Sequence, residues 1–365
     1  MDKKIRKISF PHMGNYFIAF KPLANLFADE IITPPPITKK TLEIGAKYSP
    51  EFACIPFKYN LGNYVEALES GANLLIQSGG GCRFGYYGEV QKEILKKIGY
   101  DFEFIKLNNN YFKALCEIRK FNQKLSYIKI LKTALLSYFR LKVIDRIEDI
   151  IRKNLGFETK IGEYEKTYKK FLTELDLTKN IREVNTCEKK YLSIFRKIDI
   201  KKPSNPIRVA VIGELYVLME PFSNFYIEKE LAKRGIEVHR FVTVSSILHD
   251  VFSFGFHSRK FLSQAKPYLK YHIGAHGSES VGRANQLAKD GFDGIIHIKP
   301  FGCMPEVNAM SFLHNISKDY KIPIIYFSFD SQTSEAGVKT RIEAFYDMLS
   351  MKRNSLSIYE TKANL

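Results

Sequence analysis

The stretch Gly291–Cys303, GFDGIIHIKPFGC, decides the fold of this chain. It opens on glycine, continues through the apolar run Gly294–Pro300, turns on a second glycine and reaches a cysteine before a helix-like segment. A short apolar run bounded by turn residues is typical of a strand buried on both faces, as in parallel sheets. The stretch therefore predicts a strand–turn–helix element of an α/β protein.

An earlier stretch repeats this pattern. GANLLIQSGGGC (Gly71–Cys82) also opens on glycine, contains the strand-like run Asn73–Gln77 and passes through glycines to a cysteine and a helix-like segment. Because the two stretches share the order glycine, strand, turn and cysteine, we expect two related α/β units.

The surrounding sequence extends both units and separates them. Further strand-like runs are Lys7–Phe10, Asp101–Leu107, Ile207–Glu214, Ile236–Val244 and Ile322–Asp330, with helix-like segments between them. This alternation predicts two Rossmann-like parallel-sheet units, at 1–107 and 205–351. Residues 108–204 show apolar side chains at three- and four-residue spacing, which predicts a helical module inserted between the units, and residues 352–365 are expected to form a tail.

The composition limits the class of protein. With 365 residues, 45% of them hydrophobic, the chain can bury a core of its own. No apolar run reaches the roughly 18 residues that a membrane-spanning helix needs, and the charged start MDKKIRKISF does not resemble a signal peptide. The five cysteines are an odd number, which argues against a secreted disulfide framework. We therefore expect a cytoplasmic protein without a membrane partner.

The positive charge is concentrated in one segment. The net charge is +17, and residues 111–205 contribute 23 basic and 12 acidic side chains, a net +11. Interleaved charges of this kind are typical of a solvated helical face; an acidic partner or a phosphate-bearing ligand is the alternative. A nucleic-acid partner is not expected, because no recognition helix or aromatic platform accompanies the charge.

Three cysteines lie in loops that precede helices. Cys82 and Cys303 follow predicted strands at the sheet edge where ligands bind in open α/β sheets, and Cys54 lies in a proline-containing loop. The amide groups and dipole of a helix N-terminus stabilise a thiolate. No CxxC pair is present, which excludes a zinc ribbon or a ferredoxin-type site. Three scattered thiolates fit an iron–sulfur cluster with one open iron; separate buried cysteines are the other interpretation.

The two remaining cysteines and two histidines are given ordinary roles. Cys116 and Cys187 lie among helical apolar residues and are expected to be helix positions. His272 and His276 are four residues apart, but Gly274 and Gly277 make a helix unlikely there, so we expect loop histidines.

Other polar side chains near strand ends have weaker signals. Asp330, Glu335 and Arg341 follow a strand and are expected to cap a helix or to carry surface charge, with a pocket role as the alternative. The loop GGGCRFGYYG around Cys82 has neither the Lys-[Ser/Thr] of a Walker A loop nor the spacing of a dinucleotide-binding turn. No nucleotide site is therefore predicted.

Several of these stretches together resemble the 2-hydroxyacyl-CoA dehydratase superfamily, and more closely its stand-alone, activase-associated branch. The superfamily also contains benzoyl-CoA reductase subunits. The stretches are SFPHMGNYFIAFKPL, PPPITKKTLEIGAKYSPEFACIPFK, GGGCRFGYYGEVQKEIL, IKPFGCMPE and DSQTSEAGVKTRIEAFYDML. They cover the two α/β regions, and the helical segment is covered less well.

The resemblance implies a cofactor, a partner and a chemistry. It implies an iron–sulfur cluster, most often [4Fe-4S], held by Cys54, Cys82 and Cys303, each in its matching motif. In such proteins an ATP-hydrolysing iron–sulfur activator supplies one low-potential electron, which drives radical dehydration or reduction of a substrate such as an acyl-CoA thioester. This chain has no ATP motif, so the activator is expected to be a separate protein.

Catalytic residues are not assigned by the resemblance. Arg83, Tyr86 and Tyr87 are candidates for the surroundings of the cluster or for a substrate entrance. A non-catalytic scaffold or regulatory partner of an activase, docking through the basic helical segment, is the alternative function.

Overall fold

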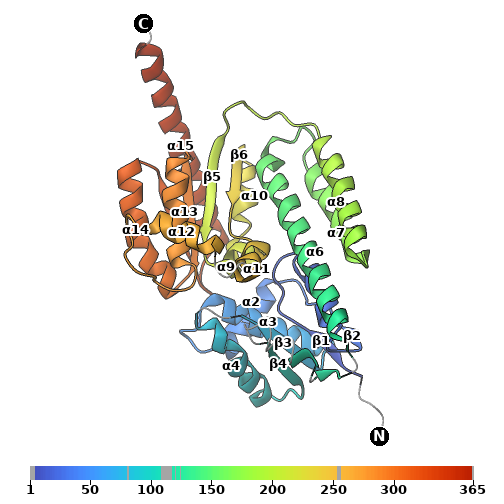
Figure 1. Ribbon diagram of the computed structural model, residues 1–365. Helices are drawn as coiled ribbons and strands as arrows, with labels where there is room; N and C mark the ends of the chain where they lie inside the picture. Colours follow the sequence, from blue (N-terminus) through green and yellow to red (C-terminus); the bar gives the residue numbers. More distant parts are fainter. Residues whose placement is uncertain are drawn as a thin grey trace. The chain divides into compact units, whose positions relative to one another are not determined.

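A computed structural model describes residues 5–79, 82–107, 117–119, 121–123, 125–252 and 256–363, and Figure 1 traces the chain. The described residues form two four-stranded sheets, each of them wholly parallel. The predicted fold class, two Rossmann-like parallel-sheet units with helices between them, is confirmed. No helix in the described part of the chain is both long and apolar enough to cross a membrane.

The chain divides into two compact units that do not follow the order of the sequence. Unit 1 contains Met1–Asp145 and Tyr168–Ser193, and unit 2 contains Arg146–Thr167 and Ile194–Leu365. The helices expected as a separate module at 108–204 are thus shared between the two units.

The sheet of unit 1 has the strand order β2-β1-β3-β4. Its elements are β1 (Lys7–Ser9), α1 (Phe17–Ala24), β2 (Glu30–Ile31), α2 (Lys39–Tyr48), α3 (Ile55–Glu69), β3 (Leu74–Ser78), α4 (Phe84–Lys97) and β4 (Glu103–Leu107). The sequence predicted β1, β3 and β4 but missed the two-residue β2. Leu74 and Ile76 of β3 pack with α1, while Leu75 packs with α3 and α4, so both faces of the sheet are covered.

Helix α3 begins earlier than the sequence indicated. The helical periodicity of the sequence covers only Gly62–Ser70, yet α3 begins at Ile55, directly after Cys54. The first turns of α3 are buried on every side, so they have no alternation of apolar and polar residues to reveal a helix. The consequence is that Cys54 lies at the helix N-terminus.

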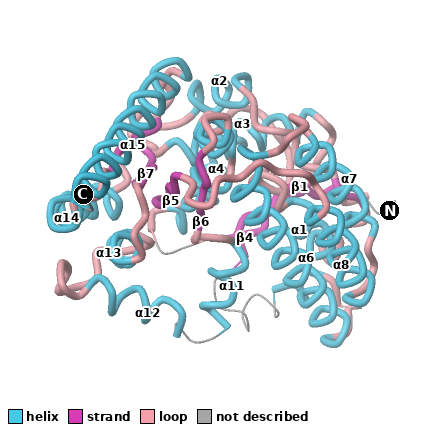
Figure 2. Tube along the Cα trace, turned by 90° about the horizontal axis from the view of Figure 1, so that it is seen from above, coloured by secondary structure: helices cyan, strands magenta, loops and turns pink. Residues whose placement is uncertain are grey.

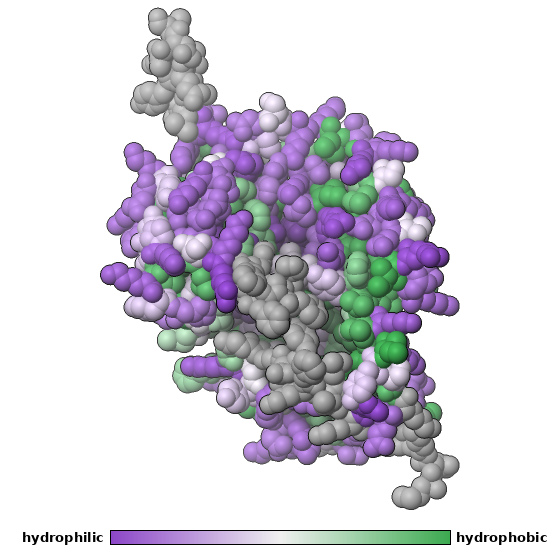
Figure 3. Space-filling model, viewed as in Figure 1, coloured by the Kyte–Doolittle hydropathy of each residue, from purple (hydrophilic) through white to green (hydrophobic). Residues whose placement is uncertain are grey.

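The segment between the sheets is helical in its described part, as predicted. It contains α6 (Tyr127–Asn154), the 3₁₀ turn η1 (Leu155–Phe157), α7 (Glu163–Leu177) and α8 (Ile181–Arg196). Within unit 1, buried Arg140 of α6 donates hydrogen bonds to the carbonyls of Ile18 and Asp176. The α6 side chains Ile128, Leu131 and Leu135 are apolar and exposed. Figure 3 colours this view of the molecule by hydropathy and shows green, apolar areas among the purple, polar ones.

The sheet of unit 2 has the order β6-β5-β7-β8. Its strands are β5 (Ile207–Gly213), β6 (Ile236–Arg240), β7 (Gly294–Pro300) and β8 (Ile324–Phe329). All four were predicted, although β6 ends four residues early, because residues 241–243 form a loop that leads into the helix beginning at Val244. The helices are α9 (Leu215–Met219), η2 (Pro221–Asn224), α10 (Ile227–Ala232), α11 (Val244–Phe252), α12 (Phe256–Ala265), α13 (Gly277–Lys289), α14 (Met304–Tyr320) and α15 (Glu335–Ala363).

Helices cover both faces of this second sheet. Ile295 of β7 packs into a core with α12, α13 and α14, which lie together in Figure 2. Gly294 faces the opposite way, toward Phe345 and Leu349 of α15. The expected tail at 352–365 begins inside α15, because no glycine or proline interrupts the helix before Ala363.

The two sheets share one strand order. In each of them the first strand along the chain lies between the second strand and the third. In open parallel sheets the ligand site lies at the carboxyl ends of the strands where this order reverses. Cys82 follows the third strand of one sheet and Cys303 follows the third strand of the other. The predicted repeat therefore places these two cysteines at equivalent points of the fold.

Candidate functional site

Unit 1 presents two thiols at helix starts. Cys54 is the N-cap residue of α3, with Pro56 in the first turn. Cys82 lies just before α4, and the backbone N–H of Phe84 donates to its Sγ atom at 3.4 Å. Amide groups at a helix start favour a negatively charged sulfur, so both settings suit a thiolate or a metal-bound sulfur.

Tyr87 of α4 contacts one thiol of unit 1 and lies within electrostatic range of the other. Its hydroxyl lies 2.6 Å from Sγ of Cys54, and its ring packs against Phe57 and Phe84. Burial raises the pKa of Tyr87 well above its usual range, and the negative charge of Cys54 and of Cys82 raises it further. Both thiols therefore act on the same hydroxyl group.

Arg83 and Tyr86, the other two candidates near Cys82, lie at the surface instead. Arg83 is exposed, and Tyr86 is 74% exposed, with the ammonium of Lys106 over its ring. Tyr87 is the candidate that faces the thiols.

Unit 2 holds the third cysteine of the predicted set. Cys303 is the N-cap residue of α14, with Pro305 in the first turn, and its side chain is half-buried. This repeats the setting of Cys54, a cysteine followed two residues later by proline at a helix start. No cluster of three or more His, Cys, Asp or Glu side chains suited to a metal ion occurs among the residues described. The structure places Cys54 and Cys82 in unit 1, with Tyr87 in contact with Cys54 and within electrostatic range of Cys82, and it places Cys303 in unit 2.

A buried polar pair lies directly after Cys303. Nε2 of His297 on β7 lies 2.7 Å from Oε2 of Glu306 on α14, and both side chains are almost fully buried. Ser280 donates from its hydroxyl to Oε1 of Glu306 at 3.2 Å. The pair therefore fixes the first turn of α14, and with it the position of Cys303, against strand β7.

Lys299 is linked electrostatically to the thiol and to Glu306 of this pair. It is a β7 side chain with only 4% of its surface exposed. Burial lowers its pKa, while attraction to Cys303 and to Glu306 raises it. Lys299 therefore interacts electrostatically with both side chains.

The glycine-rich loop before α13 packs against the start of α14. A Cβ atom on Gly277 would lie 2.5 Å from the carbonyl oxygen of Pro305, so only glycine allows this approach. The loop ends at His276, the N-cap residue of α13, whose Nδ1 lies 3.0 Å from Oε2 of Glu279. Arg283 donates two hydrogen bonds to the other oxygen of Glu279.

These contacts and electrostatic interactions connect a group of ionisable side chains, which we call the unit 2 ionisable cluster. Its members are Glu214, His276, Glu279, Arg283, His297, Lys299 and Glu306. Glu214 joins it from the end of β5, where its carboxylate accepts the N–H groups of Tyr216 and Val217 and burial raises its pKa. Burial of Glu279 raises its pKa, but His276 and Arg283 outweigh this effect and hold the pKa of Glu279 at about 2.

Sequence reasoning missed most of this cluster. The glycines at 274 and 277 indicated a loop, whereas α13 begins at Gly277. With the helix in place, His276, Glu279 and Arg283 fall on one face at spacings of three and four. That spacing was the signal in the sequence, and the glycines obscured it.

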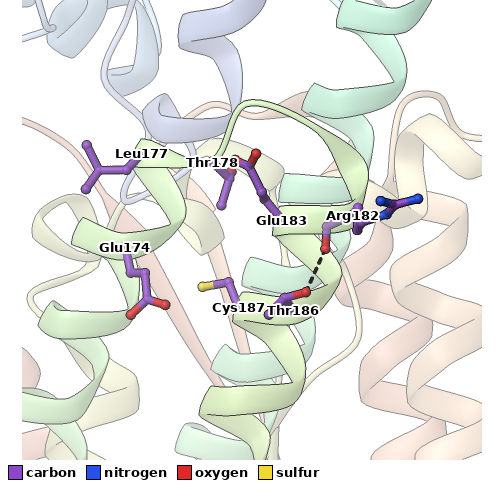
Figure 4. Close-up of a pocket in the computed structure, with 7 residues that line it drawn as sticks. All are labelled: Glu174, Leu177, Thr178, Arg182, Glu183, Thr186 and Cys187. Atoms are coloured by element: carbon purple, nitrogen blue, oxygen red, sulfur yellow. Dashed lines mark hydrogen bonds between the residues drawn. The ribbon is translucent and has the colours of Figure 1, made fainter.

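The remaining predicted positions have ordinary surroundings. Cys187 is buried in α8, and its burial together with Glu174 raises its pKa to about 11. It borders a shallow hollow of about 360 Å³ between α7 and α8, shown in Figure 4, where Cys187 and Glu174 face each other. Cys187 is thus a helix position, as predicted; Cys116 lies outside the described residues.

Of the residues after β8, Asp330 stabilises a turn rather than capping a helix, and Glu335 carries surface charge as expected. Asp330 accepts hydrogen bonds from Gln332 and Thr333, and Glu335 pairs with Lys339 at the surface. Arg341 donates to the carbonyl of Tyr326.

Comparison with known proteins gives no relative. A scan against protein-family models found no match, and no curated protein matches the sequence.

Proposed function

We propose that this chain is an iron–sulfur protein in which Cys54, Cys82 and Cys303 hold the cluster, most simply [4Fe-4S]. The single observation that carries the proposal is the contact of the Tyr87 hydroxyl with Sγ of Cys54, at a tyrosine that also lies within electrostatic range of Cys82. The equivalent position of Cys303 after the third strand of unit 2 supports it.

The donor set fits such a group. Iron–sulfur clusters are bound by thiolates, and each of the three sulfurs lies at the start of a helix, where amide groups offset negative charge. When bound, the cluster would store one electron at low potential. Tyr87 would donate a hydrogen bond to the sulfur of Cys54, and Lys299 would offset negative charge at Cys303.

The source and the use of the electron complete the proposal. We propose that a separate ATP-dependent iron–sulfur activator supplies it, and that the chain uses it to dehydrate or reduce a substrate such as an acyl-CoA thioester. This is the chemistry of the 2-hydroxyacyl-CoA dehydratase superfamily, which the cysteine motifs resemble. Because a reducing compartment keeps such thiols free, the proposal includes a cytoplasmic location.

Anaerobic purification followed by iron and sulfide counting tests the cluster. We expect a brown protein with about four irons per chain for a cubane cluster. Cys54→Ala, Cys82→Ala and Cys303→Ala should each lose iron, whereas Cys187→Ala, a cysteine outside the set, should keep it. Equal iron in all four variants would show that the ligand assignment is wrong.

The same preparation tests the alternative function. A colourless chain that still binds an activase, and that loses it when lysines of residues 111–205 are neutralised, would be a scaffold or regulatory partner. That result would replace the electron-transfer proposal.

A further inference from the structure

Lys299 is a buried cation whose charge is not matched by a direct contact. Only 4% of its surface is exposed, and its ammonium group makes no hydrogen bond or ion pair with any residue that the structure describes. The other charges around it are matched, because Glu279 pairs with Arg283. In the same way, Glu306 pairs with His297. A buried ammonium without an acceptor is destabilising, and a bound anion would offset this cost.

The side chain of Lys299 lies on the face of the sheet that α13 and α14 cover. Successive side chains of a strand point to opposite faces. Ile295 of β7 packs with α13 and α14, and His297 contacts Glu306 in the first turn of α14. Lys299 is two residues further along β7, so it points to the same face, one residue before the strand ends at Pro300.

Two helices begin beside this end of β7. They are α13, with 13 residues, and α14, with 17 residues. Their first turns are in contact, because Gly277 packs on the carbonyl of Pro305 and the hydroxyl of Ser280 donates to Glu306. The first N–H groups of a helix have no acceptor within the helix, and the helix dipole is positive there. An ammonium group and two helix starts are thus combined at the carboxyl edge of the sheet, where α/β proteins bind ligands.

This edge is open to solvent. Phe301, between β7 and α14, is 66% exposed, and Met304 in the first turn of α14 is 56% exposed. His276, the N-cap residue of α13, is also partly exposed. The nearby carboxylate of Glu214 accepts two backbone N–H groups of its own helix start. A ligand from solution therefore has access to both helix starts.

We propose that Lys299 and the first turns of α13 and α14 bind the phosphate group of a small molecule. A phosphate group carries up to two negative charges and several acceptor oxygens, which suits one ammonium group and two sets of backbone donors better than a single carboxylate does. Burial lowers the pKa of Lys299, and a bound phosphate would raise it again. The inference goes beyond the proposed function and requires neither the cluster nor an activator.

Isothermal titration calorimetry with the full-length chain tests the inference. The probes are inorganic phosphate and glycerol phosphate, and we expect one site per chain for at least one of them. Lys299→Met removes the ammonium group but keeps an unbranched side chain, so binding should weaken about tenfold or more. Lys318→Met is the matched control, because it removes an exposed lysine near the other end of α14 and should bind as the wild type does.

The two probes distinguish the sources of the phosphate group. Binding of the ester alone identifies an organic phosphate as the ligand, and binding of inorganic phosphate alone identifies the free ion; both results support the site. Acetate is the carboxylate control and should bind more weakly than either phosphate that binds. The inference is overturned if neither probe binds, if acetate binds equally well, or if Lys299→Met binds as tightly as the wild type.

Two further measurements keep the test decisive. Urea unfolding without ligand should show Lys299→Met at least as stable as the wild type, because an apolar side chain replaces an unpaired buried charge. If this variant does not fold, crystals of the wild type grown with arsenate, a phosphate analogue, decide the question. An anomalous peak within hydrogen-bond distance of the Lys299 ammonium supports the site, and its absence there overturns the inference.

Iron content of the same preparation separates this inference from the proposed function. A chain that binds phosphate through Lys299 but holds no iron overturns only the proposed function. A chain with full iron that does not bind either phosphate probe overturns only the phosphate site.

Discussion

Glu306 anchors the first turn of α14, so its removal should loosen the whole Cys303 site. In Glu306→Ala the fully buried imidazole of His297 loses its partner at 2.7 Å, and Ser280 loses an acceptor. An unsatisfied buried polar group costs about 1–3 kcal/mol, and a lost hydrogen bond about 1 kcal/mol. We therefore expect a loss of about 2–4 kcal/mol in the free energy of unfolding of unit 2.

Hydrogen exchange with mass spectrometry measures this loss where it occurs. Since each 1.4 kcal/mol is a factor of ten, amides of β7 and α14 that open with the unit should exchange roughly 30- to 1,000-fold faster. Peptides from α2 and α3 of unit 1 should not change, which gives an internal reference.

Two further variants test whether the loss of stability comes from the buried pair of His297 and Glu306. Glu306→Gln keeps an oxygen for Ser280 and an amide near His297, so it should cost less than the alanine variant. Glu335→Ala removes an exposed pair on α15 and should stay within about 0.5 kcal/mol of the wild type. If Glu306→Ala exchanges like Glu335→Ala, the buried pair does not hold α14, and the reasoning about Cys303 fails.

Three further outcomes follow from single contacts. Gly277→Ala should destabilise the protein by about 1–3 kcal/mol in urea unfolding, because its Cβ meets the α14 backbone, whereas Gly337→Ala in an exposed helix should be neutral or stabilising. Glu279→Gln should lower stability by on the order of 2–3 kcal/mol at pH 7. This carboxylate has a depressed pKa, so its contribution is present above about pH 4.5 and disappears as the pH falls through about 2; a deficit that persists at pH 2 in acid titrations would contradict this. Iodoacetamide at pH 8 should alkylate exposed Cys82 well before Cys187, whose pKa is about 11, as peptide mapping of the metal-free chain can show; equal rates would contradict the burial.

The sequence predicted most strands, because strands buried on both faces appear in it as short, mostly apolar runs bounded by turn residues. The runs Gly294–Pro300 and Ile207–Glu214 each contain only two polar side chains, and both became strands at or within one residue of those bounds. Strand β2 has two residues at the sheet edge and leaves no such run. Length and burial, rather than strand propensity alone, decided which strands could be predicted.

The candidate site was predicted one residue at a time, but its contacts were not. Turn and helix signals placed Cys54, Cys82 and Cys303 before helices, as the structure has them. The contact of Tyr87 with Cys54 depends on α4 and α3 packing together, and nothing local in the sequence encodes that. For the same reason, the buried pair of His297 and Glu306 joins a strand to a helix that only the fold brings together.

The interleaving of the two units constrains how the chain can be made and divided. Unit 1 needs residues 168–193, which leave the ribosome after unit 2 has already begun at Arg146. Synthesis therefore cannot complete the amino-terminal half and set it aside before the second half starts. It also means that no single cut yields either unit as one continuous fragment, so expression of half-length pieces should give incomplete cores that are prone to aggregate.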